Sequence, residues 1–159
     1  MTDQLEFVTY CGLCCELCAE RARIPKQAAA LQQSMTEEGW LYWGHTVPDF
    51  TEFWQFLQGL HAQGGCRGCR AGGGFPGCQI RVCVQERGLE LCSQCPDFPC
   101  EHVETLGARY PMLIADNGRL QTVGLERWLA EQHERARRGV IYSDLRYQEQ
   151  EGGGQNEEP

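Results

Sequence analysis

Eleven cysteines in a chain of 159 residues constrain the fold more than any other feature of this sequence. They fall into two blocks, one over residues 11–18 and the other over residues 66–100. A secreted disulfide scaffold is one interpretation, but the number of cysteines is odd, and adjacent Cys14 and Cys15 cannot pair without unusual backbone strain. In a reducing compartment, thiols serve mainly as metal ligands or as reactive groups. The cysteines therefore favour thiolate metal sites as the framework of the fold.

Charge and hydropathy exclude several classes of function. The formal net charge of −8 disfavours binding to DNA or RNA. No apolar run approaches the roughly 18 residues that a membrane span needs, and the first four residues lack the basic and apolar regions of a signal peptide. We therefore expect a cytoplasmic protein with no nucleic-acid partner and no membrane segment. A protein partner is compatible with these features, and the sequence does not identify one.

Two pairs of cysteines in the second block have the spacing of zinc knuckles. They are Cys66-Arg-Gly-Cys69 and Cys92-Ser-Gln-Cys95. A tight turn brings the two sulfurs of such a pair within reach of one ion, and zinc prefers four tetrahedral ligands. The pairs are separated by 22 residues, slightly more than the roughly 15–20 that are typical of such sites. We expect these four cysteines to form one four-thiolate site.

The remaining thiols of the second block are available for a second site. They are Cys78, Cys83 and Cys100. The N-terminal block could complete this site, which would pin Cys11 to Cys100. Closing so long a stretch of chain constrains the unfolded state and couples metal binding to folding. Among the histidines, His102 is kept as a spare ligand because it lies close behind Cys100.

The N-terminal block, C-G-L-C-C-E-L-C, offers two registers. Cys11, Cys15 and Cys18 are separated by three and two residues, whereas Cys11 with Cys14, or Cys15 with Cys18, gives ordinary two-residue pairs. Closely spaced cysteines of this kind also surround iron–sulfur clusters. The cofactor is therefore expected to be zinc, as one or two ions. The alternative is a [4Fe-4S] cluster on Cys11, Cys15 and Cys18 with a distant partner such as Cys100.

Outside the metal-binding loops, the sequence predicts short helices. They span residues 26–36, 48–62, 79–87, 99–109 and 123–138. Pro25 and Pro99 stand where a first-turn proline is tolerated, and a glycine stands shortly after three of the helices, where it can end them. The segment between Cys66 and Cys78 is too rich in glycine to form a regular element.

Apolar spacing on two of these helices predicts a core. In residues 48–62, apolar residues recur at intervals of three and four and so share one side of the predicted helix. They are Phe50, Phe53, Trp54, Leu57 and Leu60. In residues 123–138 the apolar stripe contains Leu125, Trp128 and Leu129. Trp40, Tyr42 and Trp43 could form a contact surface, but aromatic residues are more often buried, so we expect these three in the core.

The predicted fold class is a small, cysteine-rich, mainly α protein. Its short helices and glycine-rich loops are organised around thiolate metal sites. We predict a single metal-binding domain over residues 1–147, which includes the helix over 123–138. Residues 148–159 are polar, acidic and rich in glycine, so this tail is expected to be disordered.

Four cysteine motifs together resemble a known family. They are C-G-L-x-C-x-x-C at Cys11, Cys15 and Cys18, C-x-G-C at Cys66 and Cys69, C-x-I-R-x-C at Cys78 and Cys83, and C-x-x-C-P-x-F-P-C at Cys92, Cys95 and Cys100. Over roughly residues 8–105, the sequence resembles the bacterial and archaeal cysteine-rich family catalogued as domain of unknown function 3795. The resemblance implies metal binding by these ten cysteines without an assigned biochemical role. Cys14 departs from the family pattern and is the best candidate for a thiol that binds no metal.

These features favour a zinc-stabilised interaction or regulatory module, because closed four-thiolate sites are structural. An iron–sulfur redox or electron-transfer protein is the first alternative, and a thiol-dependent enzyme or metal-transfer protein is the second. Catalysis is the less favoured interpretation, because among eleven cysteines some thiol always has a base nearby. Nucleotide binding is unsupported, since the glycine-rich segment lacks the lysine and hydroxyl residue of a phosphate-binding loop.

Overall fold

A computed structural model describes residues 4–146, which form helices joined by loops. Within this range there is no β-strand, and an isolated antiparallel bridge joins Val8 and Cys14. The prediction of a small, mainly helical fold is confirmed. None of the described helices is both long and apolar enough to cross a membrane. The predicted disordered tail over 148–159 lies outside the described residues.

The chain divides into two compact units. Unit 1 comprises Met1–Cys18 and Gly68–Pro159, of which residues 4–18 and 68–146 are described, and unit 2 comprises Ala19–Arg67. The division describes which residues pack together, and it does not show whether the units fold independently. That residues 1–147 fold as a single domain therefore stays a prediction.

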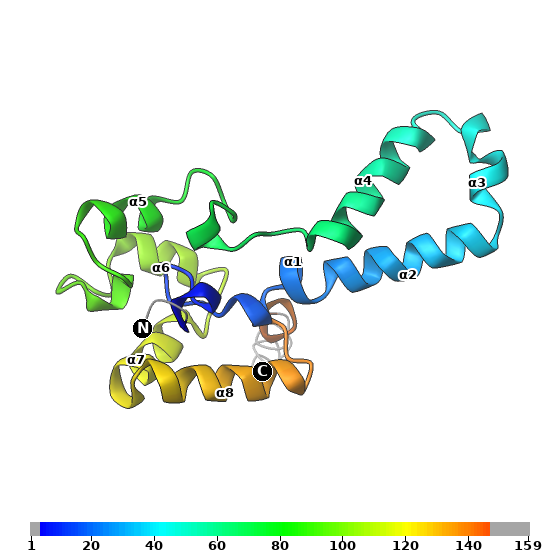
Figure 1. The fold of residues 1–159 in the computed structure, drawn as a ribbon. Coiled ribbons are helices and arrows are strands. Elements are labelled where there is room, and N and C mark those ends of the chain that lie inside the picture. Colours follow the sequence, from blue (N-terminus) through cyan, green and yellow to red (C-terminus); the bar gives the residue numbers. More distant parts are fainter. Residues whose placement is uncertain (1–3, 147–159) are drawn as a thin grey trace, which may run out of the picture. The chain divides into compact units, whose positions relative to one another are not determined.

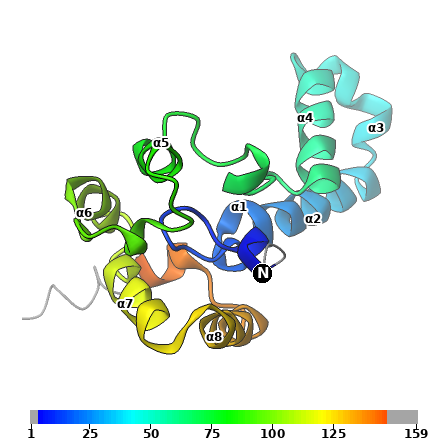
Figure 2. The same ribbon diagram turned by 60° about the vertical axis from the view of Figure 1, so that its left-hand side comes forward.

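Unit 1 carries most of the short elements. Its 3-10 helices are η1 (Gln4–Phe7), η2 (Cys15–Leu17), η4 (Cys69–Ala71) and η5 (Cys92–Gln94), and its α-helices are α5 (Gln79–Glu86), α6 (Glu101–Gly107), α7 (Leu113–Val123) and α8 (Leu125–Arg137). Figure 2 shows α7 and α8, in yellow to orange, near the N-terminal segment in blue, and α8 contacts both η1 and η2. The two ends of this unit's sequence therefore pack together.

The hydrophobic core of the described residues lies in unit 1. Trp128 on α8, Leu113 on α7, Val103 on α6 and Leu17 on η2 are fully buried. Trp128 and Leu129 are both buried, so the apolar stripe predicted for the C-terminal helix is confirmed. Burying a large apolar side chain contributes about 1.5–3 kcal/mol, so these helices hold the cysteine-bearing loops on a stable base.

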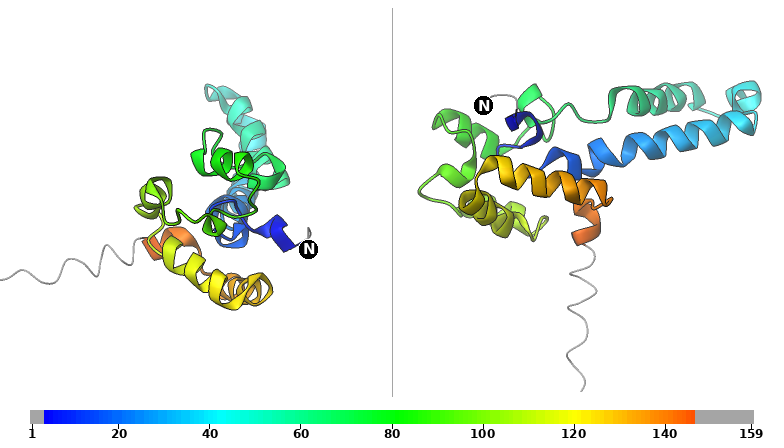
Figure 3. Two further views of the ribbon diagram at one scale, coloured as in Figure 1. Left: turned by 90° about the vertical axis from the view of Figure 1, so that its left-hand side faces the viewer. Right: turned by 60° about the horizontal axis from the view of Figure 1, so that its bottom comes forward.

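Unit 2 is a helical hairpin. Its elements are α1 (Ala19–Ala22), α2 (Ile24–Glu37), α3 (Trp40–Trp43), the 3-10 helix η3 (Gly44–Thr46) and α4 (Phe50–Gln63). Figure 1 and the right-hand view of Figure 3 show α2 and α4 side by side, with α3 between them in the chain. At the turn, the ring of Phe50 stacks on Trp40 and Trp54, with centroid distances of 5.8 and 5.7 Å.

Four of the predicted helices are confirmed with small shifts of their ends. They are the helices predicted over 26–36, 48–62, 79–87 and 123–138, which correspond to α2, α4, α5 and α8. The helix predicted over 99–109 is shorter, because Cys100 occupies the N-cap of α6. Pro99 therefore precedes the helix and is not part of its first turn.

The core predicted around α4 is wrong in part. Leu57 is 4% exposed, but Phe53 is 42% exposed and Tyr42 is 87% exposed. Trp43 is also exposed. Within unit 2 the long helix beside α4 is α2, which covers one side of it, so the apolar residues on its other side remain at the surface.

Candidate metal centre

Four cysteines of unit 1 line one small pocket. They are Cys83, Cys92, Cys95 and Cys100. The volume of the pocket is about 20 Å³. A single water molecule needs a cavity of roughly 10–15 Å³, so the pocket has room for one small guest. His102, the spare ligand suggested by the sequence, also lines this pocket.

The four thiols reach the pocket from three short elements that follow one another in the chain. Cys83 lies on α5, Cys92 begins η5, Cys95 directly follows η5, and Cys100 caps α6. The rest of the wall is mainly apolar and includes Ile80, Val84, Leu89, Phe98 and Val103. An apolar wall keeps water away from a bound cation, which strengthens its attraction to thiolates.

The turn at η5 places both sulfurs of the C-x-x-C pair on the pocket. The backbone N–H of Cys95 donates to the carbonyl oxygen of Cys92 at 3.0 Å. The side-chain oxygen of Gln94 accepts the N–H groups of Glu90 and Leu91, at 2.9 and 3.1 Å. These bonds satisfy the backbone at the start of the turn and fix its conformation. The local fold therefore prepares Cys92 and Cys95 for a shared ligand.

Arg87 supports the thiol of Cys95. Its guanidinium donates one hydrogen bond to the Cys95 sulfur at 2.9 Å and another to the Asp97 carboxylate at 2.8 Å. The hydrogen bond from Arg87 is the main cause that holds the pKa of Asp97 below its usual value. A cationic donor beside a sulfur favours the thiolate, which is the form that binds metal. Arg87 therefore has the geometry of a group that supports a metal ligand without binding the metal.

Cys92 is the most strongly perturbed thiol of the pocket. Burial raises the pKa of Cys92 to about 12, and the nearby thiols of Cys11, Cys100 and Cys95 raise it further. At neutral pH this thiol is protonated, because its charged form has lost the water that would solvate it. A bound cation supplies the missing stabilisation and displaces the proton. The arrangement therefore suits a metal ion better than an isolated thiolate.

A second group of thiols surrounds Cys11. Burial raises the pKa of Cys11 to about 11, and the neighbouring thiols of Cys69 and Cys78 add to the increase. The Thr9 hydroxyl lies 3.0 Å from the Cys11 sulfur. A Cβ atom on Gly74 would lie 3.0 Å from the Cys69 sulfur, so the glycine-rich loop passes close to this group.

Hydrogen bonds join the three cysteine-bearing segments of unit 1. Arg70 donates to the carbonyl oxygen of Val8 at 2.9 Å and to that of Glu90 at 2.7 Å. The N–H of Cys92 donates to the carbonyl oxygen of Tyr10 at 2.8 Å. The guanidinium of Arg70 also lies over the Tyr10 ring, 4.5 Å from its centroid. These bonds bring the Cys11 group and the pocket into the same unit.

Asn117 and Gly12 explain part of the first motif. Asn117 is fully buried on α7, where its amide donates to the carbonyl oxygens of Cys11 and Leu113 at 3.0 and 2.8 Å. Gly12 has a φ of +84°, and a Cβ atom there would overlap the Asn117 amide. The C-G-L motif therefore needs glycine at this position. The sequence prediction missed Asn117, although its helical spacing from Leu113 and Leu120 places it on their side of the helix.

The other cysteines of unit 1 are not among the residues that line the pocket. Cys14 is 1% exposed, and its N–H donates to the Tyr142 hydroxyl at 2.8 Å. Cys15 is buried and Cys18 is half-buried, both in unit 1. Cys66 belongs to unit 2, where it lines a different pocket. None of the eleven cysteines, all of them in the described range, forms a disulfide.

The structure brings Cys92 and Cys95 together with other thiols of unit 1, and the site predicted from Cys66, Cys69, Cys92 and Cys95 stays a prediction. Cys92 and Cys95 share a pocket with Cys83 and Cys100, and neither Cys66 nor Cys69 lines it. Across residues 4–146, no three Cys, His, Asp or Glu side chains stand close enough together to hold a metal ion as they are placed. A four-sulfur donor set suits zinc or an iron–sulfur cluster, but the sulfurs must close onto a metal in order to bind it.

Comparison with known protein families assigns the chain to one of them. The sequence profile described as "Protein of unknown function (DUF3795)" matches residues 7–105. The chain belongs to this family. The matched range of this DUF3795 protein contains all eleven cysteines and ends before α7 and α8. No curated protein matches the chain, and no solved structure matches it either. The resemblance seen in the cysteine motifs is confirmed, and the family description assigns no activity.

Proposed function

We propose that this DUF3795 protein binds zinc through cysteine thiolates and acts in the cytoplasm as an interaction or regulatory module. One ion is assigned to the pocket, where unit 1 supplies four thiols. The observation that carries this assignment is the convergence of Cys83, Cys92, Cys95 and Cys100 on one small pocket. No nucleic-acid or membrane partner is assigned.

The size and chemistry of the pocket support a single ion. Four thiolates satisfy the tetrahedral preference of zinc and leave no open position for a substrate, so the role of such an ion is structural. The pocket, with a volume of about 20 Å³, has room for a single small guest. The hydrogen bond from Arg87 to Cys95 offsets part of the negative charge that four thiolates bring together.

A second ion is proposed at the Cys11 group. Cys69 and Cys78 lie close enough to Cys11 to raise the pKa of its thiol, and Cys11 is buried. Zinc accepts three protein ligands when a fourth position is filled by another donor. Cys15, Cys18 and Cys66 keep their sequence-based assignment as metal ligands, which stays a prediction.

Metal content of matched variants tests the proposal. Protein purified without oxygen should be colourless and contain one or two zinc ions per chain by elemental analysis. Cys95→Ser should lose the ion of the pocket, whereas Cys14→Ala should keep every ion. With two ions bound, Cys69→Ser should lose only the other ion, and the Cys69→Ser/Cys95→Ser double variant should lose both. If the double variant loses only one ion, the two cysteines share a site and the grouping is wrong.

Two outcomes would replace zinc with another function. Brown protein with visible absorbance and stoichiometric iron and sulfide would identify an iron–sulfur protein. Rapid alkylation of one or two cysteines in metal-loaded protein would favour a thiol enzyme or a metal-transfer protein, because ligating thiolates of a closed site are protected. Protein that contains no tightly bound metal would contradict all of these metal assignments.

A further inference from the structure

The outer face of α4 is an apolar stripe that unit 2 leaves exposed. Phe53, Phe56 and Leu60 are spaced three and four residues apart and share one side of the helix. Phe53 is 42% exposed and Phe56 is 67% exposed, and Leu60 is partly exposed. Leu57, on the side facing α2, is buried. We call Phe53, Phe56 and Leu60 the α4 stripe.

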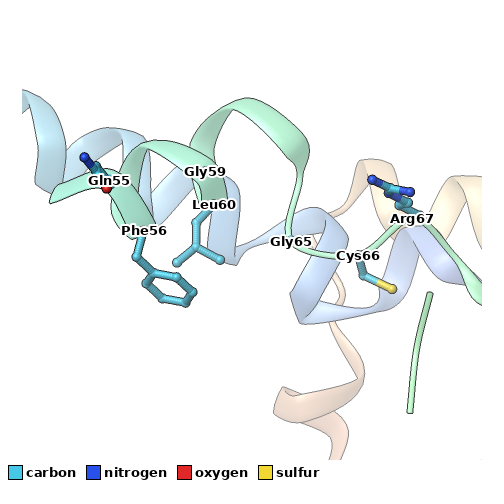
Figure 4. A pocket seen from close by; sticks show the side chains of 7 residues that line it. All are labelled: Gln55, Phe56, Gly59, Leu60, Gly65, Cys66 and Arg67. Carbon is cyan, nitrogen blue, oxygen red and sulfur yellow. The ribbon is translucent and has the colours of Figure 1, made fainter. Parts of the chain in front are cut away.

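A groove lies at the C-terminal end of the α4 stripe. Phe56, Gly59 and Leu60 line it together with Arg67, and its volume is about 390 Å³. Figure 4 shows the side chains of Phe56 and Leu60 extending from the same side of the helix. Gly59 has no side chain to fill the space between neighbouring turns. A groove of this volume accepts one or two large apolar side chains.

The charge near the start of the α4 stripe is negative, whereas Arg67 lines the groove at its other end. Residues 27–66 contain four carboxylates and no lysine or arginine. Glu52 precedes Phe56 by four residues on α4 and lies on the same side of the helix, and Asp49 stands directly before the first residue of α4. Both carboxylates are exposed, and neither forms an ion pair with any residue in the described range.

We propose that the α4 stripe binds an amphipathic helix of a partner protein that carries lysine or arginine beside its apolar face. Apolar side chains spaced along such a helix enter a groove of this kind, in the way that many helical ligands bind. Its cations face Asp49 and Glu52 and can also lie over the exposed rings of Phe53 and Phe56. Arg67 lines the opposite end of the groove, so the basic end of the ligand lies toward Asp49.

Charge selects this occupant over the alternatives. A second copy of the chain carries the same Asp49 and Glu52, and a single cation, Arg67, lines its groove, so it complements this charge less well than a helix with several lysines or arginines. Nucleic acid and anionic lipid would also be repelled by the carboxylates beside the stripe. This surface goes beyond the proposed function, because its residues lie in unit 2, outside the pocket of Cys83, Cys92, Cys95 and Cys100.

A designed peptide pair tests the proposal on the full-length, metal-loaded protein. The probe is a fluorescein-labelled amphipathic helix of leucine and lysine, and its matched control replaces every lysine with glutamate. Fluorescence anisotropy should detect binding of the lysine peptide only, and binding should weaken as salt is added. Phe56→Ser should weaken binding by about tenfold or more, and Glu52→Lys should weaken it several-fold. Metal content should stay unchanged in both variants, which separates this test from that of the metal centre.

Matched substitutions on unit 1 provide the control. Phe75→Ser and Glu104→Lys change an equally exposed aromatic residue and an equally exposed carboxylate outside the stripe, and both variants should bind the lysine peptide like the wild type. Binding that Phe56→Ser leaves unchanged, or equal binding of both peptides, would overturn the proposal. A dimer that Phe56→Ser dissociates would identify a second copy as the occupant. Phe56-dependent binding to phosphatidylcholine vesicles without peptide binding would identify a membrane. Either result would also overturn the proposal.

Discussion

The two units use their apolar residues in opposite ways. In unit 1, fully buried side chains such as Trp128, Leu113 and Val103 form a core, and ten of the eleven cysteines belong to the same unit. In the described residues of unit 2, Ala28 and Leu57 are the buried apolar side chains. Its exposed apolar residues are Leu31, Leu41, Tyr42, Trp43, Val47, Phe53 and Phe56.

This difference suggests that unit 1 provides the stability of the protein and that unit 2 provides a surface for contact with another molecule. Thiols and a packed core occur in the same unit, so metal binding and core packing are expected to stabilise one body of the protein. Unit 2 exposes aromatic rings, which we propose as part of a surface that meets another molecule. Four pairs of substitutions test this contrast.

The largest effect is expected in the core of unit 1. Trp128→Ala removes a fully buried side chain and should lower the free energy of unfolding by about 3–5 kcal/mol. Tyr42→Ala in unit 2 is the matched control, because a side chain that is 87% exposed loses little on truncation. Urea denaturation of zinc-loaded protein, followed by circular dichroism, measures both variants. Equal losses would show that the aromatic residues of unit 2 are as important for stability as the core.

Cys14 should affect stability and leave metal binding intact. Cys14→Ser places a hydroxyl at a site that is 1% exposed, and an unsatisfied hydroxyl there should cost about 1–3 kcal/mol. Cys14→Ala creates a small apolar gap and should cost less. Thermal unfolding and elemental analysis would separate the two effects. Loss of a zinc ion in either variant would make Cys14 a ligand, against its assignment as a core residue.

A pair of glycine substitutions isolates the Cys69 sulfur. Gly72 and Gly74 have φ values of +80° and +72°, so alanine at either position should cost about 1 kcal/mol of backbone strain. A Cβ atom on Gly74 would press on the Cys69 sulfur, whereas one on Gly72 would meet open space. Gly74→Ala should therefore weaken metal binding at the Cys11 group, and Gly72→Ala should not. Competition with a chelator measures the difference, and equal affinities would remove Cys69 from the ligand set.

The smallest effect on stability is expected for Arg87→Gln. The substitution removes the cationic donor to the Cys95 sulfur at the surface of unit 1. Zinc affinity should fall by about tenfold, while stability at saturating zinc should barely change. Arg109→Gln, another exposed arginine of unit 1, is the control. A variant with unchanged zinc affinity would show that the Arg87 hydrogen bond has no role in metal binding.

Local signals in the sequence were sufficient for most helices. Pro25 marks the start of α2, and glycines follow α4, α5 and α8, so the limits of these helices could be predicted closely. No helix was predicted over the residues of α7, because Asn117 interrupts its apolar spacing. That asparagine is buried by hydrogen bonds to a distant segment, which local periodicity does not reveal.

The grouping of the thiols and the exposure of α4 depend on long-range packing, which local sequence patterns do not reveal. The cysteine motifs identified the family and the candidate ligands, but the partners of each thiol depend on tertiary contacts. Arg70, for example, joins Val8 and Glu90, which are far apart in the chain. Apolar spacing on α4 also could not reveal that Phe53 and Phe56 lack a covering partner in unit 2. Periodicity reports that a face is apolar and does not report what covers it.

Hydrogen exchange with and without a strong chelator tests most directly whether metal holds unit 1 together. Removing structural zinc forfeits on the order of 10 kcal/mol, which is comparable to the whole stability of a small domain. We expect chelation to abolish the amide protection of α5 and α6 and of residues 89–100, and added zinc to restore it. If these segments keep their protection in metal-free protein, thiolate–metal bonds do not organise this fold.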